Sequence, residues 1–199
     1  MANNFTPFGF LQTRGSGSVP TYEQVPMKIA AANATAIFAG DAVVPATGPA
    51  TGYIIQATAG AIALAGIFVG CKYVSVAQKR TVWGNYWPGS DANGDIEAYV
   101  INDPNAQFIV QAGSALNLPY SKVGQLAQLG VGTGNVNTGI SGMFIASVGT
   151  TSTFPFRIVD VVTFPPGANG TDTTSVGNYV IVAFNNVATR SNGAVTGIS

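Results

Sequence analysis

Few side chains in this sequence could carry chemistry. The chain of 199 residues has no histidine, one cysteine (Cys71), and eight basic and eight acidic residues. Histidine is the commonest general base and metal ligand in proteins, so its absence argues against most hydrolytic mechanisms. Cys71 follows an apolar run and has no activating base nearby, which predicts a buried, small hydrophobic residue and neither a disulfide nor a zinc site. The composition therefore predicts a protein that is not an enzyme and needs no metal or cofactor.

One acidic segment has the spacing of a calcium loop. Asp91, Asn93 and Asp95 place oxygen-bearing side chains at alternate positions, as an EF-hand does. However, Ile96 stands where that loop needs glycine, and Asn102 stands where it needs glutamate. The segment is interpreted as a solvated hairpin turn, for which Asn93 and the glycine after it supply the turn chemistry.

A second acidic pattern resembles the carboxylate pair of glycoside hydrolases. Asp95 and Glu97 would project from the same face of a strand, as two such catalytic groups must. The only other mark of a sugar site is the aromatic cluster Trp83, Tyr86 and Trp87, next to a Pro-Gly turn. Three aromatic residues at a turn form either a corner of the core or an anchor at an interface, and the sequence leaves both open.

The charge and hydropathy patterns exclude two classes of partner. Charged residues make up 8% of the chain, against roughly 25% in ordinary soluble domains. Lys79 and Arg80 are the only adjacent basic pair, which predicts no nucleic-acid binding. The longest apolar run, Ala61 to Cys71, is shorter than the roughly 20 residues that span a membrane. The first residues lack the basic and apolar regions typical of a signal peptide, so no export signal is expected. The expected site of synthesis is the cytoplasm.

Short segments rich in Val, Ile, Phe and Thr recur between Gly, Pro, Asn and Asp. This pattern predicts an all-β barrel or sandwich of about 10–12 short strands with little helix. Strands are expected near residues 22–30, 37–44, 52–57, 62–73, 81–87, 95–101, 106–112, 125–129, 142–148, 154–164 and 178–184. The longest segments without a pattern, 131–141 and 165–176, are expected to be surface loops, and loops of that length are often functional.

The pattern also divides the chain into three parts. Residues 1–20 are expected to form an extended N-terminal arm that ends in the flexible joint Gly15–Ser18, residues 21–185 a β-rich domain, and residues 186–199 a C-terminal tail. The arm carries Phe5, Pro7, Phe8 and Phe10. These residues either contact a neighbouring molecule or form a strand on their own domain, because three aromatic rings must be buried somewhere.

Several segments, in a fixed order, resemble a family of virion proteins. They are MAN…TPFGFLQTR at the start, then residues 36–44, 56–70, 98–111 and 157–159, and an asparagine-containing strand at 180–186. In this order they are similar to the capsid decoration, or cement, proteins of tailed bacteriophages. The chain departs from the family in its low charge and in its long 165–176 loop.

The resemblance implies a function and partners. The protein would bind the outside of a phage capsid, made of a lattice of the major capsid protein, and stabilise the shell as a homo-oligomer, with trimers favoured over dimers. Its location would be the capsid exterior of the virion, after synthesis in the cytoplasm of a host bacterium. The expected capsid or subunit contacts are Phe5, Pro7, Phe8, Phe10, Trp83, Tyr86 and Trp87. The alternative is a carbohydrate-binding module of a phage fibre or tail that uses the aromatic cluster.

The absence of histidine generates a first prediction about metals. Isolated carboxylates bind calcium weakly, so calorimetric titration with calcium is expected to show no saturable site of micromolar or tighter affinity. A tight site that disappears in the Asp91→Ala or Asp95→Ala variant would contradict the hairpin interpretation.

Overall fold

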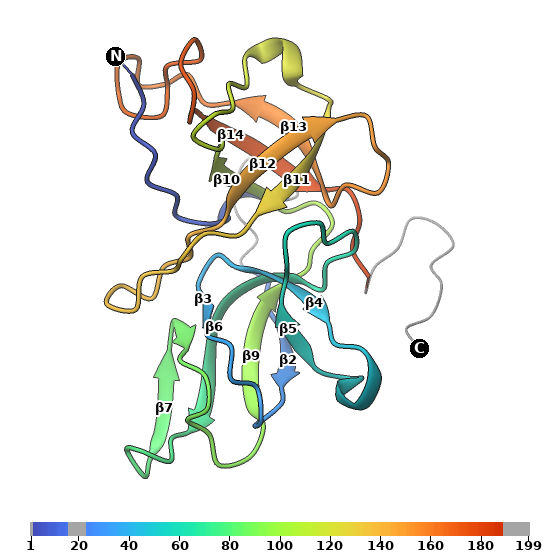
Figure 1. Cartoon of the computed structure of the whole chain (residues 1–199), viewed down its shortest axis with the longest axis vertical. Coiled ribbons are helices and arrows are strands. Elements are labelled where there is room, and N and C mark those ends of the chain that lie inside the picture. Colours follow the sequence, from blue (N-terminus) through green and yellow to red (C-terminus); the bar gives the residue numbers. More distant parts are fainter. Residues whose placement is uncertain (1, 16–22, 189–199) are drawn as a thin grey trace.

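The chain folds into two β-lobes stacked along the long axis of the molecule (Figure 1). The computed structural model describes residues 2–15 and 23–188. Strands make up 42% of the chain and helical turns 3%, which confirms the expected all-β class. The antiparallel sheets form a sandwich-like arrangement and not a closed barrel. Within the described ranges, no helix is long and apolar enough to cross a membrane.

Lobe A is built on one six-stranded antiparallel sheet. Its strands follow the order β1 (Leu11–Arg14), β10 (Gln107–Gln111), β14 (Tyr179–Phe184), β13 (Phe156–Val161), β11 (Leu126–Gly130) and β12 (Phe144–Gly149). Leu11 is paired with Ile109, so the N-terminal strand is held by the C-terminal half of the chain.

Lobe B contains the intervening part of the chain. Its larger sheet has the order β2 (Val25–Ile29), β9 (Ile96–Ile101), β6 (Gly66–Val74), β4 (Ala42–Pro45) and β5 (Ile54–Gln56), and β7 (Thr81–Gly84) pairs with the far end of β6. A small sheet joins β3 (Ile37–Phe38) to β8 (Tyr86–Trp87). The helical content of the described residues is two 3-10 turns, η1 (Gly48–Ala50) and η2 (Tyr120–Lys122).

The strands follow the alternation of apolar and polar residues. In β9, Ile96, Ala98 and Val100 are buried, whereas Glu97 and Tyr99 are partly exposed on the other face. This two-residue period is that of a strand with one face on the core. The last strand, β14, is buried along almost its whole length because it lies inside the sheet of lobe A, between β10 and β13.

Each predicted strand overlaps an observed one, but two of the predicted strands are divided. Residues 37–44 form β3 and β4, because the chain turns sharply at Gly40, whose φ is +91°, and at Asp41. Residues 81–87 form β7 and β8, which belong to different sheets. Polar residues at these turns were too few to break the apolar pattern from which the strands were predicted.

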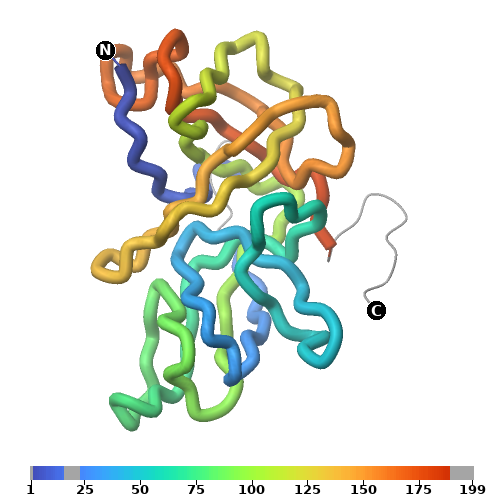
Figure 2. Tube along the Cα trace, in the orientation of Figure 1, coloured from blue at the N-terminus to red at the C-terminus, as the bar shows by residue number. Residues whose placement is uncertain are grey.

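The N-terminal segment lies on the chain's own domain. The segment is extended as expected, but residues 11–14 form strand β1, which the sequence analysis did not predict. The Asn3 side chain donates a hydrogen bond to the carbonyl of Asp172 (2.8 Å) and accepts one from the N–H of Gly170 (2.8 Å). The start of the segment therefore lies beside the 165–176 loop, and the chain runs from there to the seam between the lobes, as Figure 2 shows. Most of the predicted joint, residues 16–18, lies outside the described residues.

The aromatic rings of this segment are also used within the chain. Phe5 contacts Phe144 edge to face, with 5.3 Å between ring centroids, and Phe8 contacts Tyr179 in the same way at 5.2 Å. Phe10 stacks on Phe156 at 4.4 Å and is 2% exposed. Of the two roles left open by the sequence, packing on the chain's own core is therefore the one observed in this conformation.

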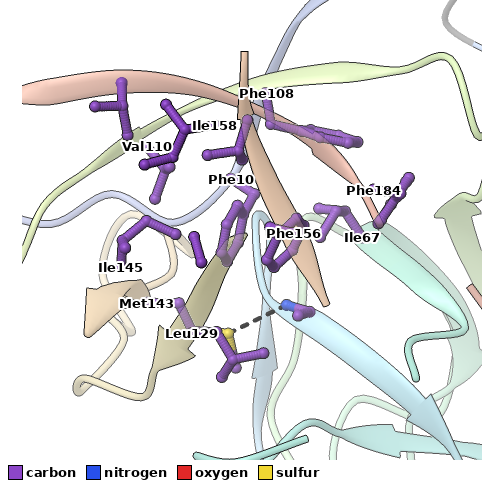
Figure 3. Close-up of a cluster of buried hydrophobic side chains, with 14 of the residues drawn as sticks. Phe10, Ile67, Phe108, Val110, Leu129, Met143, Ile145, Phe156, Ile158 and Phe184 are labelled. Atoms are coloured by element: carbon purple, nitrogen blue, oxygen red, sulfur yellow. Dashed lines mark hydrogen bonds between the residues drawn. The ribbon is translucent and has the colours of Figure 1, made fainter. Parts of the chain in front are cut away.

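One continuous core crosses the seam between the lobes. Phe10 and Phe156 from lobe A lie in the same buried cluster as Ile67 from lobe B, as Figure 3 shows. In the same region the N–H of Ala42 donates a hydrogen bond to the sulfur of Met143 (3.2 Å). A second, separate cluster fills lobe B around Phe68 and Trp87. The two lobes therefore pack as one unit.

Two segments expected at the periphery have structural contacts. The start of the predicted tail is part of the fold, because Val187 is buried and forms a parallel bridge with Leu64 of lobe B; the tail from residue 189 onward is not described. The 131–141 loop reaches lobe B, where the N–H of Ala39 donates to the carbonyl of Gly139 (3.0 Å). The N–H of Ser141 donates in turn to the carbonyl of Ala39 (2.9 Å).

The position of Phe10 predicts a large effect of its removal. Phe10→Ala deletes a buried ring at the seam and is expected to lower the free energy of unfolding by about 3–5 kcal/mol, measured by urea denaturation. The control is Phe5→Ala: Phe5 is 40% exposed, so its loss is expected to cost about 1 kcal/mol or less. Equal losses in the two variants would contradict this description of the core.

Candidate functional site

The carboxylates that the sequence analysis singled out do not come together. Asp91 accepts hydrogen bonds from the Ser75 hydroxyl (2.7 Å) and the N–H of Ala77 (2.9 Å), and these bonds lower its pKa. Asp95 accepts a bond from the Tyr53 hydroxyl (2.9 Å) instead. Each carboxylate thus stabilises a different loop. Across residues 2–15 and 23–188, no group of three Cys, Asp or Glu side chains could hold a metal ion.

Cys71 is a core residue, as predicted. It lies in β6 with 1% of its surface exposed, and its thiol contacts the carbonyl of Tyr86 at 3.5 Å. Burial raises the pKa of Cys71 to about 12, because the thiolate would lose its hydration. A nucleophilic role needs the opposite shift.

The predicted aromatic cluster is divided between the core and the surface. Trp87 is fully buried, with its ring edge to face with Tyr73, and Tyr86 is half-buried and stacks on Phe38. Trp83 is 66% exposed. The division follows from the turn at residue 85, which ends β7 and begins β8 in another sheet.

Two of the seven expected contact residues need correction. Phe10 and Trp87 are buried in the chain's own core, so their side chains cannot contact another molecule in this conformation. The other five expected contact residues keep part of their surface accessible; they are Phe5, Pro7, Phe8, Trp83 and Tyr86. They do not form one patch, since Phe5 and Phe8 pack on lobe A whereas Trp83 lies in lobe B.

An apolar pocket of about 310 Å³ lies at the seam between the lobes. Its size is within the roughly 300–1,000 Å³ that is usual for sites that receive a ligand or a partner's side chain. Its apolar lining comes from segments far apart in the sequence: Phe8, Phe10, Leu11, Ile67, Phe68 and Ile140. Gln12 and Gln24 add amide groups.

Backbone hydrogen bonds and close contacts hold together the segments that line this pocket. The N–H of Phe10 donates to the carbonyl of Gly40 (2.9 Å), and the N–H of Gly40 donates to that of Phe68 (2.8 Å). Gly9 has a φ of +75°, and a Cβ there would come within 2.5 Å of the Ser141 side chain. A residue with a side chain at position 9 would therefore push the N-terminal segment away from the seam.

Asp41 stabilises the turn that forms one wall of the pocket. Its carboxylate accepts hydrogen bonds from the N–H of Phe38 (2.8 Å) and from the Gln56 amide (2.7 Å), and it is 1% exposed. Burial raises the pKa of Asp41, because the charged form loses its hydration; the hydrogen bonds from Phe38, Ser141 and Gln56 lower it by less.

The pocket opens beside exposed apolar side chains and a strand edge. Leu11 is 61% exposed and Ile140 is 42% exposed, although both line the pocket. β1 is the first strand of its sheet, and no described strand pairs with its second edge. Such an edge can accept a strand from another chain.

Sequence reasoning missed most of this site. Four of the residues that line the pocket belong to no common sequence motif, and only the fold brings them together. They are Leu11, Gln24, Gly40 and Ile140. Phe8 and Phe10 could be named because aromatic residues in a Gly- and Pro-rich segment need a contact. No family model, curated protein or solved structure matches this chain, so the functional argument depends on the site and on the sequence segments described above.

Asp41 generates a prediction about pH. Because its pKa is raised on folding, the folded state binds the proton more tightly than the unfolded state does, and the contribution of Asp41 to stability falls as pH rises through the raised pKa. Asp41→Asn keeps an acceptor oxygen and does not titrate. The stability of the wild type relative to this variant is therefore expected to decrease as the pH rises above 3.8, the ordinary pKa of an Asp carboxyl, in urea titrations of both proteins. A difference that is constant or increases with pH would contradict the assignment.

Proposed function

We propose that the protein is a structural virion protein that binds the outside of a tailed-phage capsid and stabilises the shell. The observation that carries this proposal is the seam pocket, with its apolar lining, its exposed Leu11 and Ile140, and β1, the first strand of its sheet, beside it. The ordered segments that resemble decoration proteins supply the class of partner. The low charge of the chain fits a protein that binds by shape and apolar contact.

The proposed contact combines two kinds of interaction. A segment of the major capsid protein adds to the sheet beside β1 through main-chain hydrogen bonds and places an apolar side chain in the seam pocket. Burial of one such side chain contributes about 1.5–3 kcal/mol, and the strand edge supplies direction and register. This arrangement needs no titratable group, in agreement with a chain that has no histidine.

Stabilisation of the shell follows from mass action. A protein that bridges neighbouring capsid subunits binds the assembled lattice and not the separated subunits, so each occupied site shifts the equilibrium towards assembly. Self-association multiplies this effect by raising the effective concentration of the remaining sites. We propose a homotrimer, by analogy with the decoration proteins that the sequence resembles.

The test uses full-length protein and shells assembled from the major capsid protein of the same phage. Leu11→Asp and Ile140→Asp each place a charge at the pocket mouth and are expected to reduce binding at least tenfold in a co-sedimentation assay, since the lost burial corresponds to roughly a factor of 10–150. Because both side chains are exposed, both variants are expected to fold. Val136→Asp is the matched control: Val136 is also 61% exposed but lies in the 131–141 loop outside the pocket.

A salt series completes the test. Raising the ionic strength from about 0.05 to 0.5 M screens charge-driven attachment but leaves apolar contacts intact, so occupancy of the shell is expected to hardly change. Three outcomes would contradict the proposal. The Leu11→Asp variant could bind shells as tightly as the wild type does, high salt could release the protein reversibly, or the wild type could fail to bind shells at all.

A further inference from the structure

The outer face of lobe B carries an exposed aromatic pair. Trp83 in β7 and Tyr99 in β9 have parallel rings, with an angle of 3° between their planes and 6.2 Å between their centroids. Trp83 is 66% exposed, which is unusual for so large an apolar side chain. The two rings form one aromatic surface, which is mostly exposed at Trp83 and partly exposed at Tyr99.

The strand register explains why these side chains meet. Trp83 and Glu97 both pair with Lys72 of β6, and Tyr99 pairs with Gly70, so all of these positions face the same side of the sheet. Gly70 has no side chain, and a hollow of about 360 Å³ lined by Gly70 and by both rings lies here. A Cβ at position 70 would come within 2.8 Å of the carbonyl of Gly84, so the backbone geometry itself requires glycine there.

Polar groups are held in place along the aromatic surface. The Tyr99 hydroxyl donates a hydrogen bond to Glu97 (3.0 Å), whose other carboxylate oxygen lies 3.7 Å from the Lys72 ammonium. The same ammonium lies 5.0 Å from the centre of the Trp83 ring, within the range of a cation–π contact. The amides of Gln24 and Asn85 line the hollow.

We propose that this hollow binds a neutral saccharide. A pyranose ring has a face of C–H groups, which packs on the negative face of an aromatic ring, and hydroxyl groups around its edge, which exchange hydrogen bonds with carboxylate, ammonium and amide groups. The site offers both. Its one cation and one carboxylate cancel, so the site does not select a phosphate or a free cation.

The polar groups also favour a saccharide over a protein partner. A protein surface that covered Trp83 would remove water from the Lys72–Glu97 pair, and the cost of that desolvation often exceeds the attraction between the charges. A saccharide replaces that water with hydroxyl groups. The hollow adjoins the seam pocket, because Gln24 and Val69 line both. Leu11 and Ile140, which carry the proposed capsid contact, do not line the hollow, so the two kinds of binding can be tested separately.

The test uses intrinsic fluorescence, because the chain has two tryptophans and Trp87 is buried. Full-length protein is titrated with cellohexaose, maltohexaose, mannohexaose and chitohexaose, all soluble and neutral. At least one is expected to give a saturable change in Trp83 emission, with calorimetry as the independent measure. Salt at 0.5 M should leave the affinity unchanged, since no net charge is recognised.

Variants assign the binding to this surface. Trp83→Ala is expected to weaken the affinity at least tenfold, and Tyr99→Phe, which keeps the ring but releases Glu97, a few-fold. Tyr120→Ala is the matched control, because Tyr120 is 72% exposed, lies in lobe A and is expected to have no effect. Circular dichroism verifies that each variant is folded.

Three outcomes would overturn the inference. They are no saturable binding of any of the four saccharides, wild-type affinity in Trp83→Ala, and a change in oligomeric state of Trp83→Ala in sedimentation, which would identify this face as a protein interface. The shell assay remains independent: Leu11→Asp should bind the saccharide as the wild type does, and Trp83→Ala should bind shells normally.

Discussion

Phe10 occupies the position on which the arrangement of the two lobes depends. Its ring stacks on Phe156 in lobe A, while its N–H is bonded to the carbonyl of Gly40 in lobe B. One residue therefore contributes apolar burial to one lobe and a backbone hydrogen bond to the other. The N-terminal segment is thus one of the elements that join the lobes, beside the Ala42–Met143 hydrogen bond and the Leu64–Val187 bridge.

The seam also explains the pattern of glycines and short turns near it. The N-terminal segment must approach both the Gly40 turn and Ser141 closely, and Gly9, with a φ of +75°, permits that approach. Asp41 holds the turn from the other side by hydrogen bonds to the Phe38 N–H and to Gln56. Burial of that carboxylate is unfavourable in itself, and its hydrogen bonds offset part of the cost. The pocket thus depends on tightly packed backbone rather than on reactive side chains.

The two candidate binding surfaces differ in chemistry in a way that matches their positions. The seam pocket is apolar, lies between the lobes and borders a strand edge, which suits a peptide segment of another protein. The face around Trp83 combines aromatic rings with the Lys72–Glu97 pair, which suits a hydroxylated ligand. The two surfaces adjoin, because Gln24 and Val69 line both the seam pocket and the hollow beside Trp83.

The sequence alone determined the fold class, nearly all of the strands and the absence of the usual catalytic groups, because these depend on local patterns and on composition. Alternation along residues 95–101 identified β9, and the lack of histidine was visible without any structure. Tertiary structure alone decided the pairing of β1 with β10, the burial of Phe10 and Trp87, and the meeting of Trp83 with Tyr99. The physical reason is that a two-residue period says which side chains share a face of a strand, but not which distant strand lies beside it. That choice is made by long-range packing, which no local pattern records.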